Sequence, residues 1–379
     1  GMAFIVSNDR KKIKYRPILT MLVLQFVLGF LLLNTSAGNV LISTIANGFT
    51  ALLNCAREGI NFVFGRLANP DDPIFFMSVL MPITFISALI GILQHWHILP
   101  FIIKYIGLAL SKVNGMGKLE SYNAVASAIL GQSEVFISVK KLLGPLPPNR
   151  LYTLCASAMS TVSMSIVGAY MVMIEPKYVV TALVLNLFGG FIIASIINPY
   201  EVKPEDDILV VAETKRQSFF EMLGEYILDG FKVGVIVCAM LIGFVGIITL
   251  INNIFLGIIG ISFQEILGYL FSPFAFFMGI PMAECVDAAS LMATKIVANE
   301  FVAMMQLSSG TVILSAKSVA IVSIFLVSFA NFSSIGIIAG AVKALNEEKG
   351  NVVACFGLRL LYGATLVSIL NATIVGLII

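Results

Sequence analysis

Charged residues are scarce in this sequence. Asp, Glu, Lys and Arg make up 12% of its 379 residues, whereas 59% are hydrophobic and the mean hydropathy is +0.99. Soluble domains carry roughly 25% charged residues, so this composition predicts an integral membrane protein. The 23 basic and 21 acidic residues give a net charge of only +2. This near balance does not favour nucleic acid or an acidic macromolecule as a partner.

Cysteine and histidine are also rare. The two histidines, His95 and His97, flank the only tryptophan, but side chains two apart on a helix diverge, so we expect an interfacial belt rather than a metal site. The motifs GxSxG, HExxH and the P-loop are absent, so we expect neither an enzyme nor a cofactor. The five cysteines form no CxxC pair and are expected to be apolar fillers: Cys55, Cys155, Cys238, Cys285 and Cys355.

Long apolar runs dominate the chain instead. The basic run RKKIKYR at 10–16 lies beside the first of them and is expected to face the cytoplasm. We expect spans at 18–33, 73–93, 178–197 and 233–250, and a last one at 356–379. Amphipathic or interfacial helices are expected at 40–64, 99–110, 218–231 and 262–276. Solvated segments are expected at 203–217, including the acidic Glu205-Asp206-Asp207, and at the turn 346–349.

Four apolar runs are interrupted by polar residues. The first contains Gly131-Gln132-Ser133-Glu134, and the third contains Asn299-Glu300. A carboxylate in a membrane interior costs roughly 2.5–3.5 kcal/mol, so it normally faces a cavity or a partner. Each is followed by a second interruption, at 159–165 and at 329–334. This pairing predicts an internal repeat of hairpin plus broken helix, the pattern of a midplane site in a secondary transporter. The alternative is that these Ser and Thr residues hold helices together.

The polar groups favour a neutral, hydroxyl-rich ligand. An ionised carboxylate accepts hydrogen bonds from two vicinal hydroxyls, as in a ribose. The amides of Gln132 and Asn331 can donate and accept, which suits a pyrimidine ring, and Phe329 or Phe332 could stack on it or simply pack. Basic residues are absent from the interruptions, which argues against an anionic substrate.

The motifs GQSE, STVSMSIVGAY, VANEFVA and FANFSSIGIIAGA together resemble those of the concentrative nucleoside transporters, most closely the bacterial NupC-like permeases. The resemblance covers essentially the whole chain. Similar proteins carry one more hydrophobic helix before SNDRKK, of which 2–6 is expected to be a remnant. The resemblance implies a homotrimer in a bacterial cytoplasmic membrane, with a scaffold domain and a transport domain that moves like an elevator.

The expected fold is therefore all-α, with two inverted repeats, each containing a re-entrant hairpin and an unwound transmembrane helix. Residues 1–117 would form N-terminal scaffold spans and interfacial helices. The first repeat, 118–199, would contain a hairpin at 118–148, a broken helix at 151–173 and the span 178–197. Residues 200–275 would supply a polar loop, an amphipathic helix, a scaffold span and an interfacial helix. The second repeat, 276–379, would contain a hairpin at 277–305, a broken helix at 318–342 and the last span.

The resemblance also implies roles for single residues. Gln132, Ser133 and Glu134 would contact the nucleobase, and Ile166 and Val233 would give it apolar contacts. The ribose would be held by Glu300, Asn331 and Ser334, with Phe329 beside sugar and base. The nucleobase preference implied by this branch is for pyrimidine nucleosides and adenosine over guanosine.

The coupling ion is where this sequence departs from its sodium-coupled relatives. They place an asparagine four residues before the hairpin glycine and a serine at the first break, where this chain has Ser127 and Thr161. Leu130 and Val162 would add backbone oxygens to a sodium site there. We expect proton coupling, with Glu134 or Glu300 as carrier, because burial favours a protonated carboxyl. Alternatives are sodium coupling, another neutral solute, a gated pore, or an enzyme acting on a lipid-borne substrate.

Overall fold

The computed structural model describes residues 1–68, 74–203, 205–207, 209 and 217–379, and no strand occurs in these ranges. Seven of its helices, counted over the same ranges, are long and apolar enough to cross a membrane. The N-terminal part contains α1 (Met2–Ile5), η1 (Arg10–Lys12), α2 (Tyr15–Asn34), α3 (Ser36–Phe64), η2 (Gly65–Ala68), η3 (Phe76–Leu80), α4 (Pro82–His95) and α5 (Ile98–Asn114). The prediction of an all-helical protein with several spans is confirmed at this level.

The middle of the chain contains seven helices over the described residues, including the longest one, α12. It comprises α6 (Lys118–Leu130), α7 (Val135–Ser138), α8 (Lys140–Leu143), α9 (Pro148–Ser160), α10 (Met164–Met173), α11 (Pro176–Ile197) and α12 (Phe219–Ile259). The last part comprises α13 (Phe263–Phe277), η4 (Met282–Glu284), α14 (Cys285–Val297), α15 (Glu300–Ser308), α16 (Ala316–Leu326), α17 (Phe332–Leu345), α18 (Glu347–Cys355) and α19 (Gly357–Ile378).

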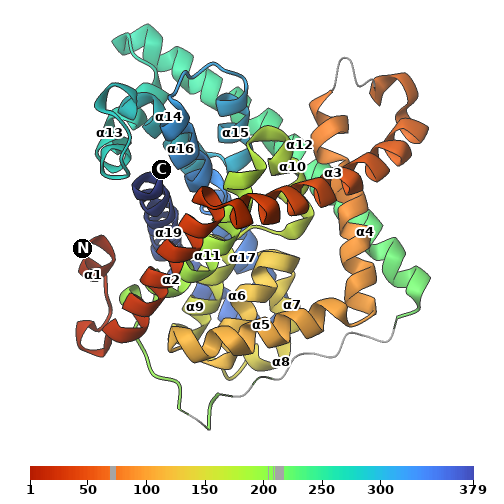
Figure 1. Ribbon diagram of the computed structural model, residues 1–379, viewed down its shortest axis with the longest axis vertical. Helices are drawn as coiled ribbons and strands as arrows, with labels where there is room; N and C mark the ends of the chain where they lie inside the picture. Colours follow the sequence, from red (N-terminus) through yellow and green to blue (C-terminus); the bar gives the residue numbers. More distant parts are fainter. Residues whose placement is uncertain (69–73, 204, 208, 210–216) are drawn as a thin grey trace.

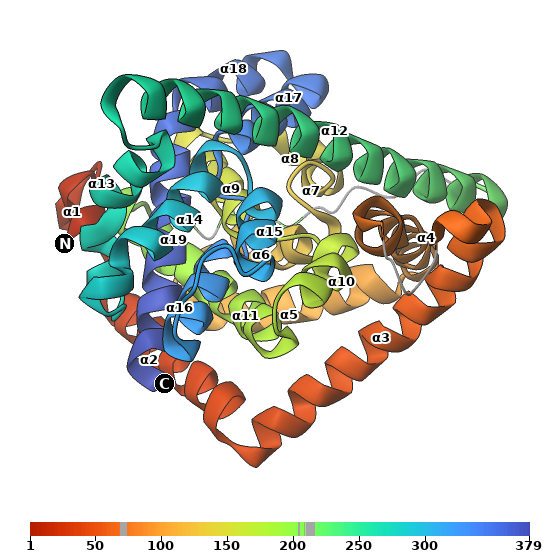
Figure 2. The ribbon, with the colours of Figure 1, turned by 90° about the horizontal axis from the view of Figure 1, so that it is seen from above.

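Two long helices border a helical core. Seen from above, α3 and α12 run along two outer edges and approach each other near α4, while α6, α9, α10, α14, α15 and α16 lie between them (Figure 2). In the most apolar 18 residues of each span, 78% are buried in Pro148–Met173 but only 17% in α12. We call α3, α4 and α12 the frame and the enclosed helices the core.

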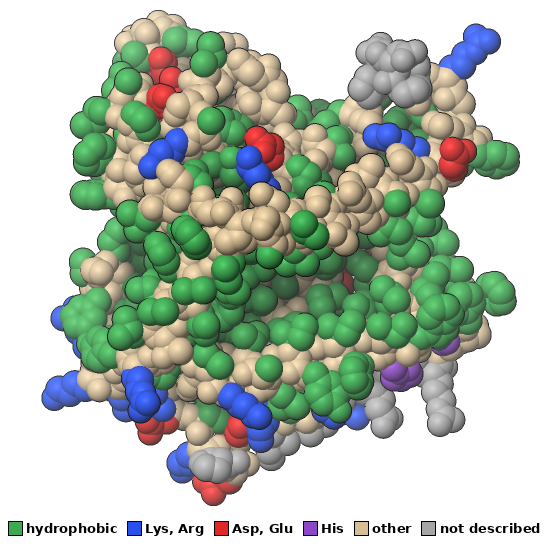
Figure 3. Space-filling view, in the orientation of Figure 1, with side chains coloured by type: hydrophobic (Ala, Val, Ile, Leu, Met, Phe, Trp, Pro, Cys, Tyr) green, Lys and Arg blue, Asp and Glu red, His purple; other side chains and the backbone are tan. Residues whose placement is uncertain are grey.

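Charge and hydrophobicity divide the surface as expected for a membrane protein. Lys, Arg, Asp and Glu side chains gather toward the two ends of the molecule, and a broad hydrophobic belt lies between them (Figure 3). Within the belt this face is hollowed below α3 (Figures 1 and 3). Exposing so many apolar side chains to water would be unfavourable in free energy, so the belt is suited to contact lipid.

Glycines allow α12 to approach α4 closely. A Cβ at Gly91 would lie 2.5 Å from the Tyr226 ring, and one at Gly230 would lie 2.7 Å from Ser87. Membrane helices use such small residues where backbones meet. The α4–α12 seam therefore fixes the two frame helices to each other.

Two predictions made for this part of the chain are wrong. The expected amphipathic helix 218–231 and span 233–250 form the single helix α12, because Ser218 and Glu221 make a capping box and nothing breaks the helix before Gly260. The expected turn 346–349 begins α18: the Asn346 side chain accepts from the Lys349 amide and caps that helix.

Part of the polar segment 203–217 lies outside the described residues. Pro73, at which the span 73–93 is expected to begin, also lies outside them. The acidic part of the polar segment is attached to the core rather than simply solvated. The Asp207 carboxylate accepts from the Lys118 amide at 2.7 Å, and Arg150 donates to the Asp206 carbonyl at 2.9 Å. Arg150 also forms a buried bidentate pair with Glu120, at 2.6 and 2.9 Å. This network ties the segment to the start of the first hairpin.

Candidate functional site

The first interruption forms a turn between helix α6 and the short helix α7. Helix α6 ends at Leu130, and Gly131 follows with a φ of +119°. A Cβ there would lie 2.8 Å from Glu134 Oε2, so this conformation and this closeness both require glycine. The chain resumes as the short helices α7 and α8. Residues 118–148, for which we expect a re-entrant hairpin, thus contain α6, this turn and the short helices α7 and α8.

The tip of this turn has few internal hydrogen bonds. Gln132 is buried, and its Oε1 has no hydrogen-bond partner among the described residues. The Ser133 hydroxyl donates to Glu134 Oε2 at 3.0 Å. The Glu134 side chain is exposed, whereas the next two residues, Val135 and Phe136, are fully buried. The tip therefore combines a buried amide with an exposed carboxylate.

The first helix break follows at Thr161–Ser163, between α9 and α10. The Ser163 hydroxyl donates to the Leu130 carbonyl at 3.2 Å, which joins the break to the first hairpin. Ile166 is buried one turn further along α10. Within the range 151–173, where we expect a broken helix, the chain thus leaves the helical conformation at Thr161–Ser163.

The second hairpin places a carboxylate in the core. Helix α14 ends at Val297, and the Asn299 side chain caps α15 by accepting from the Val302 amide at 3.0 Å. Glu300 is 3% exposed. Its Oε1 accepts from the Tyr170 hydroxyl at 2.7 Å, and its Oε2 accepts from Asn331 Nδ2 at 3.0 Å. Two of the roughly four acceptor positions of this carboxylate remain for a ligand.

The second break, at 327–331, is held by hydrogen bonds from several helices. Lys295 Nζ donates to the Phe325 carbonyl at 2.7 Å, and Asn186 Nδ2 donates to the Val327 carbonyl at 2.7 Å. The Asn331 Oδ1 accepts from the Ser334 amide at 2.9 Å and thereby caps α17. Ser334 is buried, and its hydroxyl is without a partner in the ranges that the structure describes.

The two breaks lie directly against each other. The Phe329 amide, in the second break, donates to the Thr161 carbonyl, in the first, at 3.1 Å. Tyr170 of α10 reaches Glu300, which adds the second hairpin, and Leu130 adds the first through Ser163. All four interruptions therefore meet in one region, far apart as they are in the sequence.

The remaining predicted residues fall into three groups. Phe329 is buried beside Thr161, whereas Phe332 is half exposed and does not share that enclosure. Val233 lies on the frame helix α12 and is partly buried. The hydroxyls of Ser127 and Thr161 donate to the carbonyls of Asn123 and Ser157 in their own helices, at 2.7 and 3.2 Å. Ser127 Oγ also accepts from Asn123 Nδ2 at 3.5 Å, and the Leu130 carbonyl accepts from Ser163. Among the described residues each of these oxygens keeps at least one lone pair unused, and Val162 is fully buried next to Thr161.

Sequence reasoning missed several residues that support the second break. Lys295 lies four residues before Asn299, outside the interruption itself, yet its ammonium donates to the Phe325 carbonyl beside the second break. The absence of basic residues from the interruptions therefore does not mean that no cation lies near them. A lone lysine in an apolar run was the available signal. Tyr170 and Asn186 lie in other helices, and nothing local in the sequence connects either one with the break.

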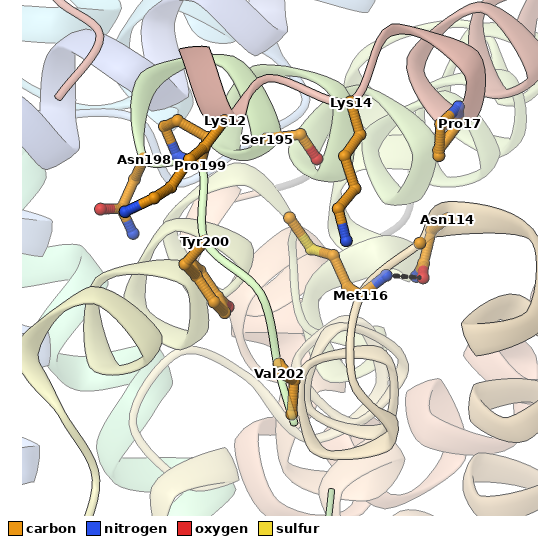
Figure 4. A pocket seen from close by; sticks show the side chains of 11 residues that line it. Lys12, Lys14, Pro17, Asn114, Met116, Ser195, Asn198, Pro199, Tyr200 and Val202 are labelled. Carbon is orange, nitrogen blue, oxygen red and sulfur yellow. Dashed lines mark hydrogen bonds between the residues drawn. The ribbon is translucent and has the colours of Figure 1, made fainter. Parts of the chain in front are cut away.

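Two cavities are lined by residues other than the predicted site residues. One, at the basic N-terminal segment, is lined by Lys12, Lys14, Asn198 and Tyr200 (Figure 4). Another, of about 400 Å³, lies between α12, α13, α14 and α15 and includes Gln264 and Gln306. No cluster of three or more metal-ligating side chains was found within the described ranges.

The fold and the site define a class: a multi-span membrane protein with a polar, carboxylate-containing region enclosed by broken helices. Three family models match consecutive parts of the chain. They are described as the N-terminus of Na+ dependent nucleoside transporters (residues 1–67), nucleoside recognition (76–177) and the C-terminus of Na+ dependent nucleoside transporters (178–376).

Individual relatives agree with the family models. The chain is 38% identical to the purine nucleoside transport protein NupG of Bacillus subtilis, covering 100% of this chain and 96% of NupG. It is 31% identical to the nucleoside permease NupC of Helicobacter pylori, covering 100% and 95%. The inward-facing, substrate-bound structure of CNTnw matches with a TM-score of 0.94 at 28% identity, covering 100% and 96%.

The chain therefore belongs to the concentrative nucleoside transporter family. It is a multi-pass membrane protein and a nucleoside transporter, not an enzyme. The resemblance inferred from the four motifs is confirmed.

Proposed function

We propose that this protein imports nucleosides across a bacterial cytoplasmic membrane in symport with protons. One observation carries the proposal. Gln132 Oε1, in the turn after α6, and Ser334 Oγ, in the first turn of α17, are buried and have no partner among the described residues. Because an unpaired buried polar atom is costly, a matching ligand is the natural partner for both.

The proposed roles differ between the first half of the site, in residues 118–199, and the second half, in residues 276–379. The free acceptor positions of Glu300 would take the ribose hydroxyls, with Asn331 and Ser334 beside them. Phe329 would pack against sugar and base. The base would meet the loosely bonded tip of the first hairpin and two apolar side chains: Gln132, Ser133, Glu134, Ile166 and Val233.

The proposed coupling ion is a proton, and Glu134 is the better carrier of the two acids. Both oxygens of Glu300 already accept hydrogen bonds, from Tyr170 and from Asn331, so this carboxylate is engaged in holding the second half together. The exposed Glu134 accepts a side-chain hydrogen bond only from Ser133 among the described residues. A carboxyl in such surroundings exchanges its proton more readily.

Movement is proposed to be of the elevator type. The core would slide against the frame of α3, α4 and α12, each hairpin closing one side of the site, with the two halves related as inverted repeats. The contrast in burial between core and frame supports this division. The same frame would hold three copies together as a homotrimer.

Sodium coupling remains the second candidate. The lone pairs on Ser127, Thr161 and the Leu130 carbonyl, with Val162 adjacent, favour it. Uptake of nucleoside into sodium-free proteoliposomes, with and without an inward proton gradient, separates the two. We expect gradient-dependent accumulation without sodium; uptake that needs sodium and ignores pH would reject proton coupling.

The base preference is a separate part of the proposal. The branch resemblance favours uridine, cytidine and adenosine, whereas a relative at 38% identity is named for purine nucleosides. Competition of labelled uridine uptake by cytidine, adenosine, inosine and guanosine would rank them. We expect adenosine to compete in either case, because it belongs to both ranges. Competition by inosine and guanosine but not by cytidine would reject the pyrimidine preference.

A further inference from the structure

Lys295 is fully buried in the core, where a charged side chain is stable only with complete compensation. Its Nζ donates to the Phe325 carbonyl at 2.7 Å, to the Ser328 hydroxyl at 2.6 Å and to the Ser368 hydroxyl at 3.1 Å. It also lies 4.5 Å from the centre of the Phe325 ring. An ammonium has three protons, so these three acceptors and the ring face satisfy it as a cation.

The place of this cation is electrostatically favourable. Lys295 stands in the last turn of α14, and Phe325 stands in the last turn of α16. The final carbonyls of a helix lack intrahelical donors and form the negative end of its dipole. The ammonium therefore lies where two helix C-termini converge, and Ser368 extends its contacts to α19.

The first half also has two helices that end at an interruption, but it has no lysine or arginine in the last turn of either helix. These two helices, α6 and α9, correspond to α14 and α16. The last turn of α6 carries the hydroxyl of Ser127 instead. The chain thus supplies a positive charge to the second break and leaves the first without one.

We infer that the ammonium of Lys295 supplies the positive charge that the second break requires. A covalently attached side chain thus occupies a position where a dissolved cation would otherwise be favoured. It holds the end of α16 to α14 and α19, and so positions Asn331 and Glu300. It is a positioning residue, because all three protons are used inside the protein. The inference rests on the proposed function in taking Glu300 to hold the ribose.

Chemical rescue tests this directly. Lys295→Ala removes the atoms of a propylammonium ion from the core. With the full-length purified protein, we expect uridine and inosine to bind Lys295→Ala at least tenfold more weakly than wild type. Added n-propylammonium chloride should restore most of the loss, whereas tetramethylammonium chloride, which has no N–H donor, should not. Lys317→Ala, at an exposed position on α16, is the matched control and should bind like wild type.

Other results would overturn the inference. The inference would be overturned if Lys295→Ala bound nucleosides as tightly as wild type. It would also be overturned if 1-propanol, which fills the space without the charge, restored binding as well as propylammonium does. If Lys295→Ala does not fold, Lys295→Met keeps the length without the charge, and unchanged binding there would count equally against it. If wild type binds neither nucleoside, the proposed function fails instead. Thermal stability of Lys295→Ala with and without propylammonium then still tests the cation.

Discussion

The two helix breaks share one construction but are held very differently. In the second, the carbonyls of Phe325 and Val327 accept from side chains of α14 and α11, and Glu300 accepts on both oxygens. In the first, the Ser163 hydroxyl donates to the Leu130 carbonyl, but Ser160 Oγ at the end of α9 has no partner among the residues described. In the adjoining hairpin, Glu134 accepts a side-chain hydrogen bond only from Ser133 within those residues. Side chains of other helices therefore hold the second break more firmly than the first, and we call the second braced and the first loosely bonded.

This difference suits the two parts of a nucleoside. The ribose is the same in every nucleoside, so a rigid half can bind it with preorganised groups. The base differs from one nucleoside to another, so the half that contacts it must adapt to several shapes. A side chain that gains and loses a proton must also exchange hydrogen-bond partners. A loosely bonded half is suited both to binding different bases and to carrying the proton. Under the proposed function, the second half provides constant affinity and the first provides adaptation and coupling.

The largest expected effect comes from removing the charge in the braced half. Glu300→Gln keeps the shape but weakens its acceptor strength, and hydrogen bonds to charged groups contribute about 1.5–3 kcal/mol. We expect the Kd for uridine to rise about 10- to 100-fold by isothermal titration calorimetry. Glu347→Gln, on the exposed first turn of α18, should leave the Kd unchanged. An unaltered Kd in Glu300→Gln would remove this residue from the site.

A smaller effect is expected from loosening the brace itself. Asn186→Leu removes the donor to the Val327 carbonyl and interrupts a buried amide chain that continues through Asn371 to Gln25 on α2. Leaving such partners unpaired costs about 1–3 kcal/mol each. We expect a lower thermal midpoint and weaker uridine binding together. The exposed Asn47→Leu on α3 serves as control, and equal midpoints for the two variants would contradict the brace.

The tip of the first hairpin should be more sensitive in binding than in stability. Gly131→Ala puts a Cβ at a φ of +119° and 2.8 Å from Glu134 Oε2, a strain of about 1–3 kcal/mol. Because this tip is loosely bonded, it can shift to relieve the strain. We expect a several-fold loss of uridine affinity with a small change in thermal midpoint. Gly243→Ala, in open space on α12, should leave the affinity unchanged and should not lower the thermal midpoint.

The smallest effect is expected in the first break. Ser160→Ala removes a buried hydroxyl that lacks a partner in the described structure, so no hydrogen bond is lost. Removing an unpaired buried polar group is neutral or slightly stabilising. The thermal midpoint should stay the same or rise. A clear fall would mean that this break is braced after all and that the contrast between the halves is overstated.

The sequence predicts the interruptions better than their supports. Gln132, Glu134, Glu300 and Asn331 stand out because polar residues inside apolar runs violate the membrane pattern. Tyr170 does not stand out, because a tyrosine fits an apolar helix and its partner Glu300 is 130 residues away in the sequence. Long-range pairing of this kind depends on how the helices pack, which no local pattern records.

Helix boundaries show the same limit. Apolar runs give the spans closely, since Tyr15–Asn34 and Pro176–Ile197 each enclose the predicted range. The change from mixed to purely apolar residues within 218–250 does not end a helix, because α12 keeps its hydrogen bonds through both parts. The side chains change their environment while the backbone continues.

The asymmetry between the acids is tested most directly in proteoliposomes with Glu134→Gln. We predict that this variant still exchanges internal for external uridine at equilibrium, but no longer accumulates uridine in response to an inward proton gradient. Wild type should do both. Retained gradient-driven accumulation in Glu134→Gln would show that another group carries the proton and would contradict the division between the two halves.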